Sequence, residues 1–213
     1  MNYEQTEKMV PVICVMEDHV RLSEEDCVAL FGTTELAKLK DLGQEGEWVA
    51  KNKLFVEMEN GKHAEVVVIM PCVNKTEVCL CSSTVARLDG RADLVAPNKR
   101  ANSTRVAIEN PEPTHNVVLA RNNAVKRLIR HIHLPKEIRE IYGVEIGDTV
   151  IAEINGKRGV ILDQVVVVNS TNRLGKELEL HVDKDEGFAF GVFEDMTYAK
   201  IYVKSKNGTE PKE

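Results

Sequence analysis

The chain has 213 residues, of which 43% are hydrophobic and 29% charged, an ordinary composition for one large or two small globular domains. Its 34 acidic residues outnumber its 28 basic residues, which argues against nucleic acid as the main partner because a phosphate backbone needs a basic surface. No apolar run approaches the about 18 residues of a membrane span, and five cysteines argue against a disulfide framework. We therefore expect a cytoplasmic protein with reduced thiols and no membrane attachment.

The first elements in chain order are a strand and two helices. Residues 10–16, "VPVICVM", predict a buried strand. Ser23 is a suitable N-cap for a short helix that ends at Gly32. A second helical stretch is expected near Glu35–Leu42.

A hairpin follows, and the second half of the chain repeats the pattern of the first. "LFVEMENGKHAEVVVIMP" predicts a hairpin with Asn60-Gly61 at its tip, and "KTEVCLCSS" predicts a further strand. "RHIHLPKEIREIYGVEIGD" then repeats the form of "DHVRLSEEDCVALFG", and "TVIAEINGKRGVILDQVVVV" repeats the hairpin with Asn155-Gly156 at its tip. The segment Leu94–His115, rich in Pro and Asn, predicts loops. We expect a mainly β fold of two small β-barrel-like units, related by internal duplication and capped by short α-helices.

The histidines suggest a metal site. In "LIRHIHLPKE", His131 and His133 share one face of a strand, and His181 ends another strand of period 2. If the two copies pack about a pseudo-two-fold axis, His19 converges on the same place. Three imidazoles on a dry β surface favour Zn²⁺ with an open fourth position, as catalytic zinc requires. Taken singly, each histidine could instead be a hydrogen-bonded residue at a strand end.

Other candidate residues have equally plain alternatives. Cys79-x-Cys81 places two thiols on one strand face, where they are either small buried hydrophobes or thiolate ligands. Lys40 is either a solvated charge or a ligand-binding lysine. The acids Asp183, Asp185 and Glu186 do not fit a calcium loop, and they either orient the histidines or face water.

These segments, with "LKDLGQEGEWVAKNKL", "MPCVNKTEVCLC" and "LHVDKDEGFAFG", resemble the phosphate propanoyltransferase family from about Val10 to Ala189. "RHIHLP" is the most specific piece of the resemblance. The resemblance implies two β-barrels capped by short helices, with the active site between them. It also implies transfer of an acyl group between coenzyme A and inorganic phosphate at a pair of zinc ions.

The resemblance also implies a domain layout, since the family's N-terminal strand joins the C-terminal barrel. We expect residues 1–17 and 129–204 to form that barrel and residues 18–128 the central one. The polar segment 205–213 predicts a disordered tail. A homodimer is a further implication of the resemblance.

Site residues follow from the same resemblance. One zinc site of the family matches His131, His133 and His181, and the lysine that contacts coenzyme A matches Lys40. The family's other zinc site matches His19 together with Cys79, which stands where the family has a glutamate.

The chain departs from the family's pattern at several positions. Arg21 replaces the second histidine of the family's first His-x-His, and Val73 stands where the family has a phosphate-binding arginine. Basic groups that could replace that arginine include Arg21 and Arg130, because guanidinium groups bind phosphate bidentately.

Two functions from different classes fit the sequence. The first is a phosphate acyltransferase that converts a short-chain acyl-CoA and phosphate to acyl phosphate and CoA at a zinc site. The second is a divergent, non-catalytic zinc-binding member of the family that acts as a binding or scaffold protein.

Overall fold

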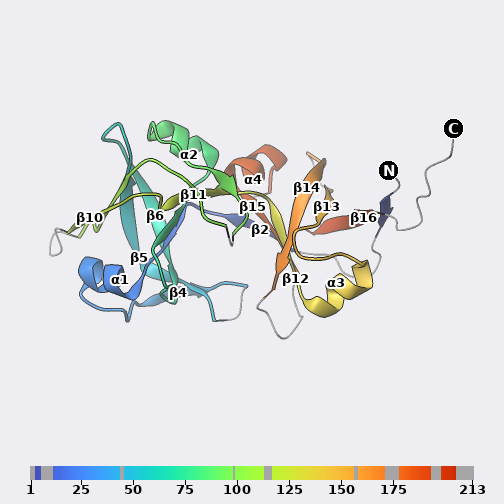
Figure 1. Ribbon diagram of the computed structural model, residues 1–213, viewed down its shortest axis with the longest axis horizontal. Helices are drawn as coiled ribbons and strands as arrows, with labels where there is room; N and C mark the ends of the chain where they lie inside the picture. The colour runs from blue at the N-terminus through green and yellow to red at the C-terminus, as the bar shows by residue number, and fades with distance from the viewer. Residues whose placement is uncertain are drawn as a thin grey trace. The chain divides into compact units, whose positions relative to one another are not determined.

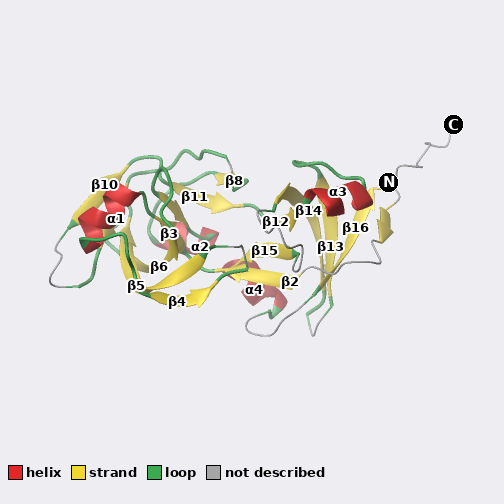
Figure 2. Cartoon of the chain, turned by 90° about the horizontal axis from the view of Figure 1, so that it is seen from below, coloured by secondary structure: helices red, strands yellow, loops and turns green. Residues whose placement is uncertain are grey.

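The computed structural model describes residues 3–5, 12–43, 46–97, 99–112, 117–155, 158–170, 178–192 and 198–204. The described residues form many strands and only a few short helices, so the fold is mainly β, as expected (Figures 1 and 2). The strands are β1 (Tyr3–Gln5), β2 (Val12–Met16), β3 (His19–Arg21), β4 (Lys38–Asp41), β5 (Trp48–Glu57), β6 (His63–Met70), β7 (Glu77–Cys79), β8 (Leu94–Val95), β9 (Val106–Glu109), β10 (Val118–Arg121), β11 (Val125–Leu128), β12 (His131–Leu134), β13 (Thr149–Ile154), β14 (Val160–Asn169), β15 (Glu179–Asp183) and β16 (Ala199–Lys204). The helices are α1 (Glu24–Phe31), α2 (Ser82–Arg87), α3 (Lys136–Tyr142) and α4 (Lys184–Phe190).

The chain divides into two compact units, which we call unit 1 and unit 2. Unit 1 comprises residues 1–15, 130–182 and 186–213, and unit 2 comprises residues 16–129 and 183–185. The expected barrel boundaries at 17/18 and 128/129 lie close to these divisions, and their status as independent folding domains stays a prediction. The expected disordered tail, 205–213, lies outside the described residues.

Unit 2 contains a nine-stranded sheet in the order β10-β9-β5-β6-β3-β7-β11-β8, with β4 paired to β5. Its core is almost wholly aliphatic, with Leu22, Leu54 and Ile108 among the side chains that have no exposed surface. Burial alternates over the first six residues of β6, where one face of the strand packs inward and the other is more exposed. The long β5–β6 hairpin is the one that the Asn-Gly pair predicted.

Unit 1 contains a seven-stranded sheet in the order β1-β16-β13-β14-β12-β15-β2. The N-terminal strand β2 therefore lies beside β15, far from it in sequence. A second core fills this unit, built around Ile132, Leu134 and Leu180, all fully buried. The β13–β14 hairpin is present as predicted, while two residues at its tip, 156 and 157, lie outside the described residues.

The predicted duplication is confirmed by strand pairing. In unit 2, β3 runs parallel to β6 and antiparallel to β7. In unit 1, β12 runs parallel to β14 and antiparallel to β15. A helix follows each of the four corresponding strands in the same place: α1 after β3, α3 after β12, α2 after β7 and α4 after β15. The two units therefore repeat one supersecondary plan.

The predicted helix starts and stops follow ordinary capping chemistry. The Ser23 hydroxyl accepts the backbone N–H of Asp26 at 3.2 Å, which satisfies one of the donors at the start of α1. Gly32 ends α1 with φ 74°, and Gly143 ends α3 with φ 65°, a conformation that glycine adopts without steric cost. Among the described residues, none of the helices is long and apolar enough to cross a membrane.

Two sequence-based expectations about secondary structure were wrong. The expected helix near 35–42 is instead strand β4, because pairing with β5 overrides the local helix preference of "ELAKLKDLG". The expected loop at 94–115 contains β8 and β9. In β9, Val106 and Ile108 are fully buried, so the alternation of a half-buried strand was present in a segment rich in loop residues.

Candidate metal centre

Three histidines of unit 1 converge, and we call them the histidine triad. His131 and His133 lie on β12, and His131 pairs directly with His181 of β15. The ring centroids are 5.1 Å apart for His131–His133, 4.9 Å for His131–His181 and 4.5 Å for His133–His181. One potential ligand atom from each residue lies within 4.8 Å of the others. Residues that alternate along one strand and pair across to the next therefore meet on one face of the sheet.

Hydrogen bonds orient two of the three rings. His133 Nδ1 lies 3.0 Å from the carbonyl oxygen of Asn169. Because a carbonyl only accepts, Nδ1 carries the proton and the lone pair belongs to Nε2. His181 Nε2 donates to Glu179 Oε2 at 2.9 Å, within a pair whose side chains are nearly buried. Contacts of this kind fix the tautomer of metal-ligating histidines.

The donor set of the triad fits a zinc ion. Neutral imidazole is a preferred zinc ligand, and three histidines with one open position are a known arrangement of catalytic zinc. His131 is 1% exposed and the other two are partly buried, so coordination would occur in a largely dry environment. This convergence is the geometric relationship on which the sequence-based metal hypothesis depends.

Arg130 precedes the triad and forms an ion pair with α4. Its Nη2 lies 2.7 Å from Glu186 Oε1, and both side chains are partly exposed. The predicted role of Arg130 as a phosphate-binding group would require phosphate to share or displace this carboxylate.

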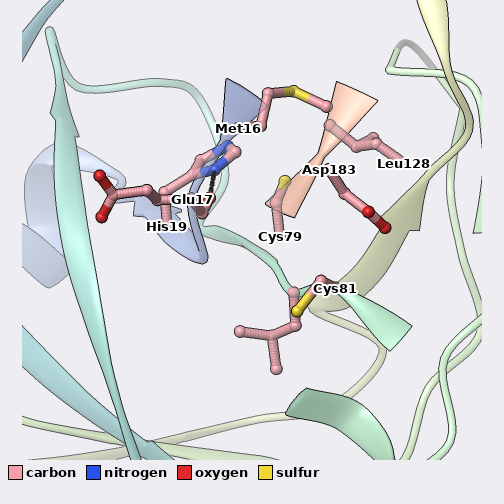
Figure 3. A pocket seen from close by; sticks show the side chains of 8 residues that line it. Met16, Glu17, His19, Cys79, Cys81, Leu128 and Asp183 are labelled. Carbon is pink, nitrogen blue, oxygen red and sulfur yellow. Dashed lines mark hydrogen bonds between the residues drawn. The ribbon is translucent and has the colours of Figure 1, made fainter. Parts of the chain in front are cut away.

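Unit 2 places His19, Arg21 and Cys79 at the positions that correspond to the triad. His19 pairs with Cys79, as His131 pairs with His181, and Arg21 pairs with Glu77, as His133 pairs with Glu179. His19 and Cys79 line one small pocket of about 10 Å³, roughly the space of one water molecule (Figure 3). The expectation that His19 and Cys79 bind a metal together stays a prediction, while Arg21 offers no lone pair to a metal.

The two potential ligands of unit 2 are held in their neutral forms by burial. Burial lowers the pKa of His19 to about 4, although its hydrogen bond to the carbonyl of Glu17, at 2.8 Å, opposes the shift. Burial raises the pKa of the Cys79 thiol to about 11, even though the nearby Lys126 ammonium favours the thiolate. Cys79 is therefore a protonated thiol near neutral pH in the metal-free chain.

The basic groups of this part of unit 2 are paired with carboxylates. Arg21 donates twice to Glu47, at 2.9 and 2.6 Å, in the bidentate geometry typical of strong guanidinium pairs. Lys126, 5% exposed, donates to Glu77 at 2.6 Å and to the carbonyl of Pro97 at 2.8 Å. Arg21 and Lys126 thus each have a matched anion.

The remaining sequence-based candidates belong to unit 2. Lys40 is exposed on β4 of unit 2, opposite Val49, instead of at a helix end. Val73 forms an isolated bridge with Ser23 and supplies no charge. Asp185 accepts two hydrogen bonds from Ser83 at the start of α2, at 2.6 and 2.8 Å, and the hypothesis that it orients the histidines stays a prediction.

Sequence reasoning missed the partners of the candidate residues. Glu179 was identifiable, because it lies two residues before His181 in a strand of period 2 and so shares its face. Asn169, Glu47 and Lys126 gave no such signal. Each meets its partner only through the register of strands that are distant in sequence.

Comparisons with known proteins agree on one family. The family model described as phosphate propanoyltransferase matches residues 12–193. The chain is 32% identical to a phosphate propanoyltransferase of Leptotrichia buccalis over 181 residues, which cover 84% of this chain and 82% of the relative. It is 31% identical to that of Clostridioides difficile (88% and 86% covered) and 29% identical to that of Sebaldella termitidis (87% and 85% covered). The chain therefore belongs to the phosphate propanoyltransferase family, which is a family of acyltransferases.

Proposed function

We propose that this protein transfers a short acyl group from coenzyme A to inorganic phosphate, giving acyl phosphate and free CoA. Family membership supports the reaction class, and the printed names of the relatives support phosphate and a propanoyl group as reactants. The observation that carries the proposal is the convergence of the histidine triad in unit 1. We further propose that the enzyme works in the cytoplasm, where the four cysteines that the structure describes would remain the free thiols seen here. A homodimer stays a prediction.

The triad is the proposed zinc site. Zinc, when bound, would supply a Lewis acid able to polarise a thioester carbonyl or a phosphate oxygen, worth several kcal/mol of charge stabilisation. The protein's part is to hold three imidazoles in one place and to fix the tautomers of two of them. Asn169 does so for His133, and Glu179 does so for His181. His131, almost fully buried, keeps the centre dry.

Positively charged side chains are the proposed binding groups for the anionic reactants. We propose Arg130 and Arg21 as phosphate-binding residues, because guanidinium groups match the geometry of phosphate oxygens. Their carboxylate partners, Glu186 and Glu47, would preorient the guanidinium planes. Lys40, exposed on β4, is the proposed contact for the phosphates of coenzyme A. Holding both reactants in place lowers the entropic part of the barrier.

A non-catalytic role is the second candidate. Val73 stands where the sequence resemblance implies a phosphate-binding arginine, and the guanidinium groups of Arg21 and Arg130 are already paired with carboxylates. A chain that kept the fold and the metal but lost phosphate binding would act as a binding or scaffold protein.

One assay separates the two candidates. Zinc-loaded protein is mixed with propanoyl-CoA, with and without phosphate, and free thiol is measured over time. The acyltransferase proposal predicts thiol release that requires phosphate and falls at least tenfold in Arg130→Ala. Arg158→Ala, which removes an exposed guanidinium between β13 and β14 instead, is the matched control. No phosphate-dependent release from correctly folded, zinc-loaded protein would favour the non-catalytic role.

A further inference from the structure

The duplicated register allows the two units to be compared position by position. His19, Arg21 and Cys79 of unit 2 occupy the places of the histidine triad in unit 1. The resemblance to the family implies a second zinc ion at this place. The donor set does not fit one, since a guanidinium stands at one of the three ligand positions and has no lone pair to give.

The arginine is fixed in place. Its two hydrogen bonds to Glu47, 2.9 and 2.6 Å long, join β3 to the start of β5, and the two side chains are 23% and 25% exposed. This bidentate geometry holds the guanidinium as a permanent positive charge. Glu47 is at the same time occupied, so it is not available as a replacement metal ligand.

A second cation, Lys126, lies on β11, the strand that flanks β7 on the side away from β3. Lys126 of β11 is paired in register with Cys79 of β7 and is 5% exposed. Its ammonium is bonded to Glu77, the residue that corresponds to Glu179 of unit 1, and to the carbonyl of Pro97. The carboxylate that could have attracted a metal therefore neutralises a lysine instead. A divalent ion at this place would have to compete with Arg21 and Lys126 for the carboxylates of Glu47 and Glu77.

We propose that Arg21 and Lys126 have replaced the metal in unit 2, so that each chain binds a single metal ion, at the histidine triad of unit 1. In unit 2 the ion pairs Arg21–Glu47 and Lys126–Glu77 stand where unit 1 offers metal ligands and the carboxylate beside them. The part concerning unit 1 rests on the proposed function. The part concerning unit 2 stands on its own ion pairs and register.

The test is metal counting on designed variants. Purified chain is equilibrated with zinc, freed of excess metal, and its zinc content is measured per chain by mass spectrometry. We expect one zinc in the wild-type chain. The double variant Arg21→His/Cys79→His rebuilds three histidines in unit 2 and should gain one further zinc. The matched control Arg21→Lys/Cys79→His keeps a cation at position 21 and should gain none.

Cobalt substitution supplies a second measurement that does not depend on those variants folding. Cobalt bound by a cysteine thiolate shows a ligand-to-metal charge-transfer band in the near ultraviolet. We expect no such band in the wild-type chain. Two metal ions in the wild type, with a thiolate band that disappears in Cys79→Ser, would overturn the inference. A wild-type content of zero would remove the metal from the proposed function, while a gain of one in the double variant would still support the inference for unit 2.

Discussion

At the scale of single residues, the proposed metal site depends on the hydrogen bonds that orient the histidines as much as on the histidines themselves. Hydrogen bonds that hold imidazole rings in one tautomer make a cluster of histidines a more credible zinc site. The contacts of Asn169 and Glu179 are what distinguish the triad from three unrelated imidazoles. The corresponding contacts in unit 2 hold cations instead, which is why the same backbone plan supports different chemistry there.

Replacing Glu179 by Gln should weaken zinc binding without unfolding unit 1. The change keeps the shape of the side chain but removes the charge that makes His181 a better donor, so zinc affinity should fall about 10- to 100-fold. Competition against a coloured chelator measures the affinity. Glu140→Gln, which removes an exposed carboxylate from α3, is the control and should leave it unchanged. Equal affinities in both variants would argue against a metal-tuning role for Glu179.

The ion pair between Asp26 and Arg121 should make unit 2 sensitive to acid. Burial raises the pKa of Asp26, but hydrogen bonds from Arg121 and Thr76 outweigh it and hold that pKa below 3.8. A carboxyl group with a lowered folded-state pKa stabilises the fold above its unfolded-state value and loses that contribution as pH falls through the folded value.

Asp26→Asn should therefore lower the free energy of unfolding near neutral pH and flatten its dependence on pH below about 4. We expect a loss of roughly 2 kcal/mol at pH 7, less than for a fully buried pair because Arg121 is partly exposed and can be solvated. Chemical denaturation at several pH values measures it. The exposed Asp41→Asn serves as comparison, and an equal acid slope in wild type and Asp26→Asn would refute this assignment.

At the scale of elements, local sequence signals predicted whatever is decided locally. The start of α1 at Ser23, its end at Gly32 and the hairpin tip at Asn60-Gly61 each follow from the side chains present. Strand β4 could not be predicted in this way, because its strand character comes from pairing with β5. The three histidines of the triad were predictable from the sequence, but the orientation of their rings was not. The ring of His133 is oriented by Asn169 at the end of β14, which is distant in sequence.

Helix α4 packs so closely against its neighbours at Gly187 that one added methyl group should lower the stability of the fold. A Cβ at Gly187 would lie 2.7 Å from one methyl carbon of Val15 and 3.2 Å from the carbonyl oxygen of Val192. Alanine improves helix propensity by about 1 kcal/mol, but overpacking against a stiff β-branched side chain costs about 1–3 kcal/mol. We expect Gly187→Ala to be destabilising by about 1 kcal/mol, measured by thermal or chemical unfolding.

A second variant tests whether that close contact is the cause. In the background Val15→Ala, the clash disappears and Gly187→Ala should become neutral or stabilising. A loss of the same size in both backgrounds would mean that Val15 is not responsible.

At the scale of the whole molecule, the duplication is the organising fact. Two copies of one strand and helix plan carry two versions of one site, a set of three imidazoles in unit 1 and a set of paired ions in unit 2. The repeat was recognisable from sequence because its helices, hairpins and histidines recur in the same order. In the sequence, the divergence of the second site was visible only as single-residue changes. The structure adds that Arg21 is paired with Glu47 and that Lys126 is paired with Glu77.

The most direct test of the central claim reads metal content and acyl transfer on the same samples. Zinc per chain and phosphate-dependent thiol release from propanoyl-CoA are measured for wild type, for His181→Ala and for His63→Ala, which removes an exposed histidine of unit 2. The account predicts that His181→Ala loses its zinc and at least 100-fold of its rate, while His63→Ala keeps both. A His181→Ala protein that turns over acyl-CoA at the wild-type rate without bound zinc would contradict it.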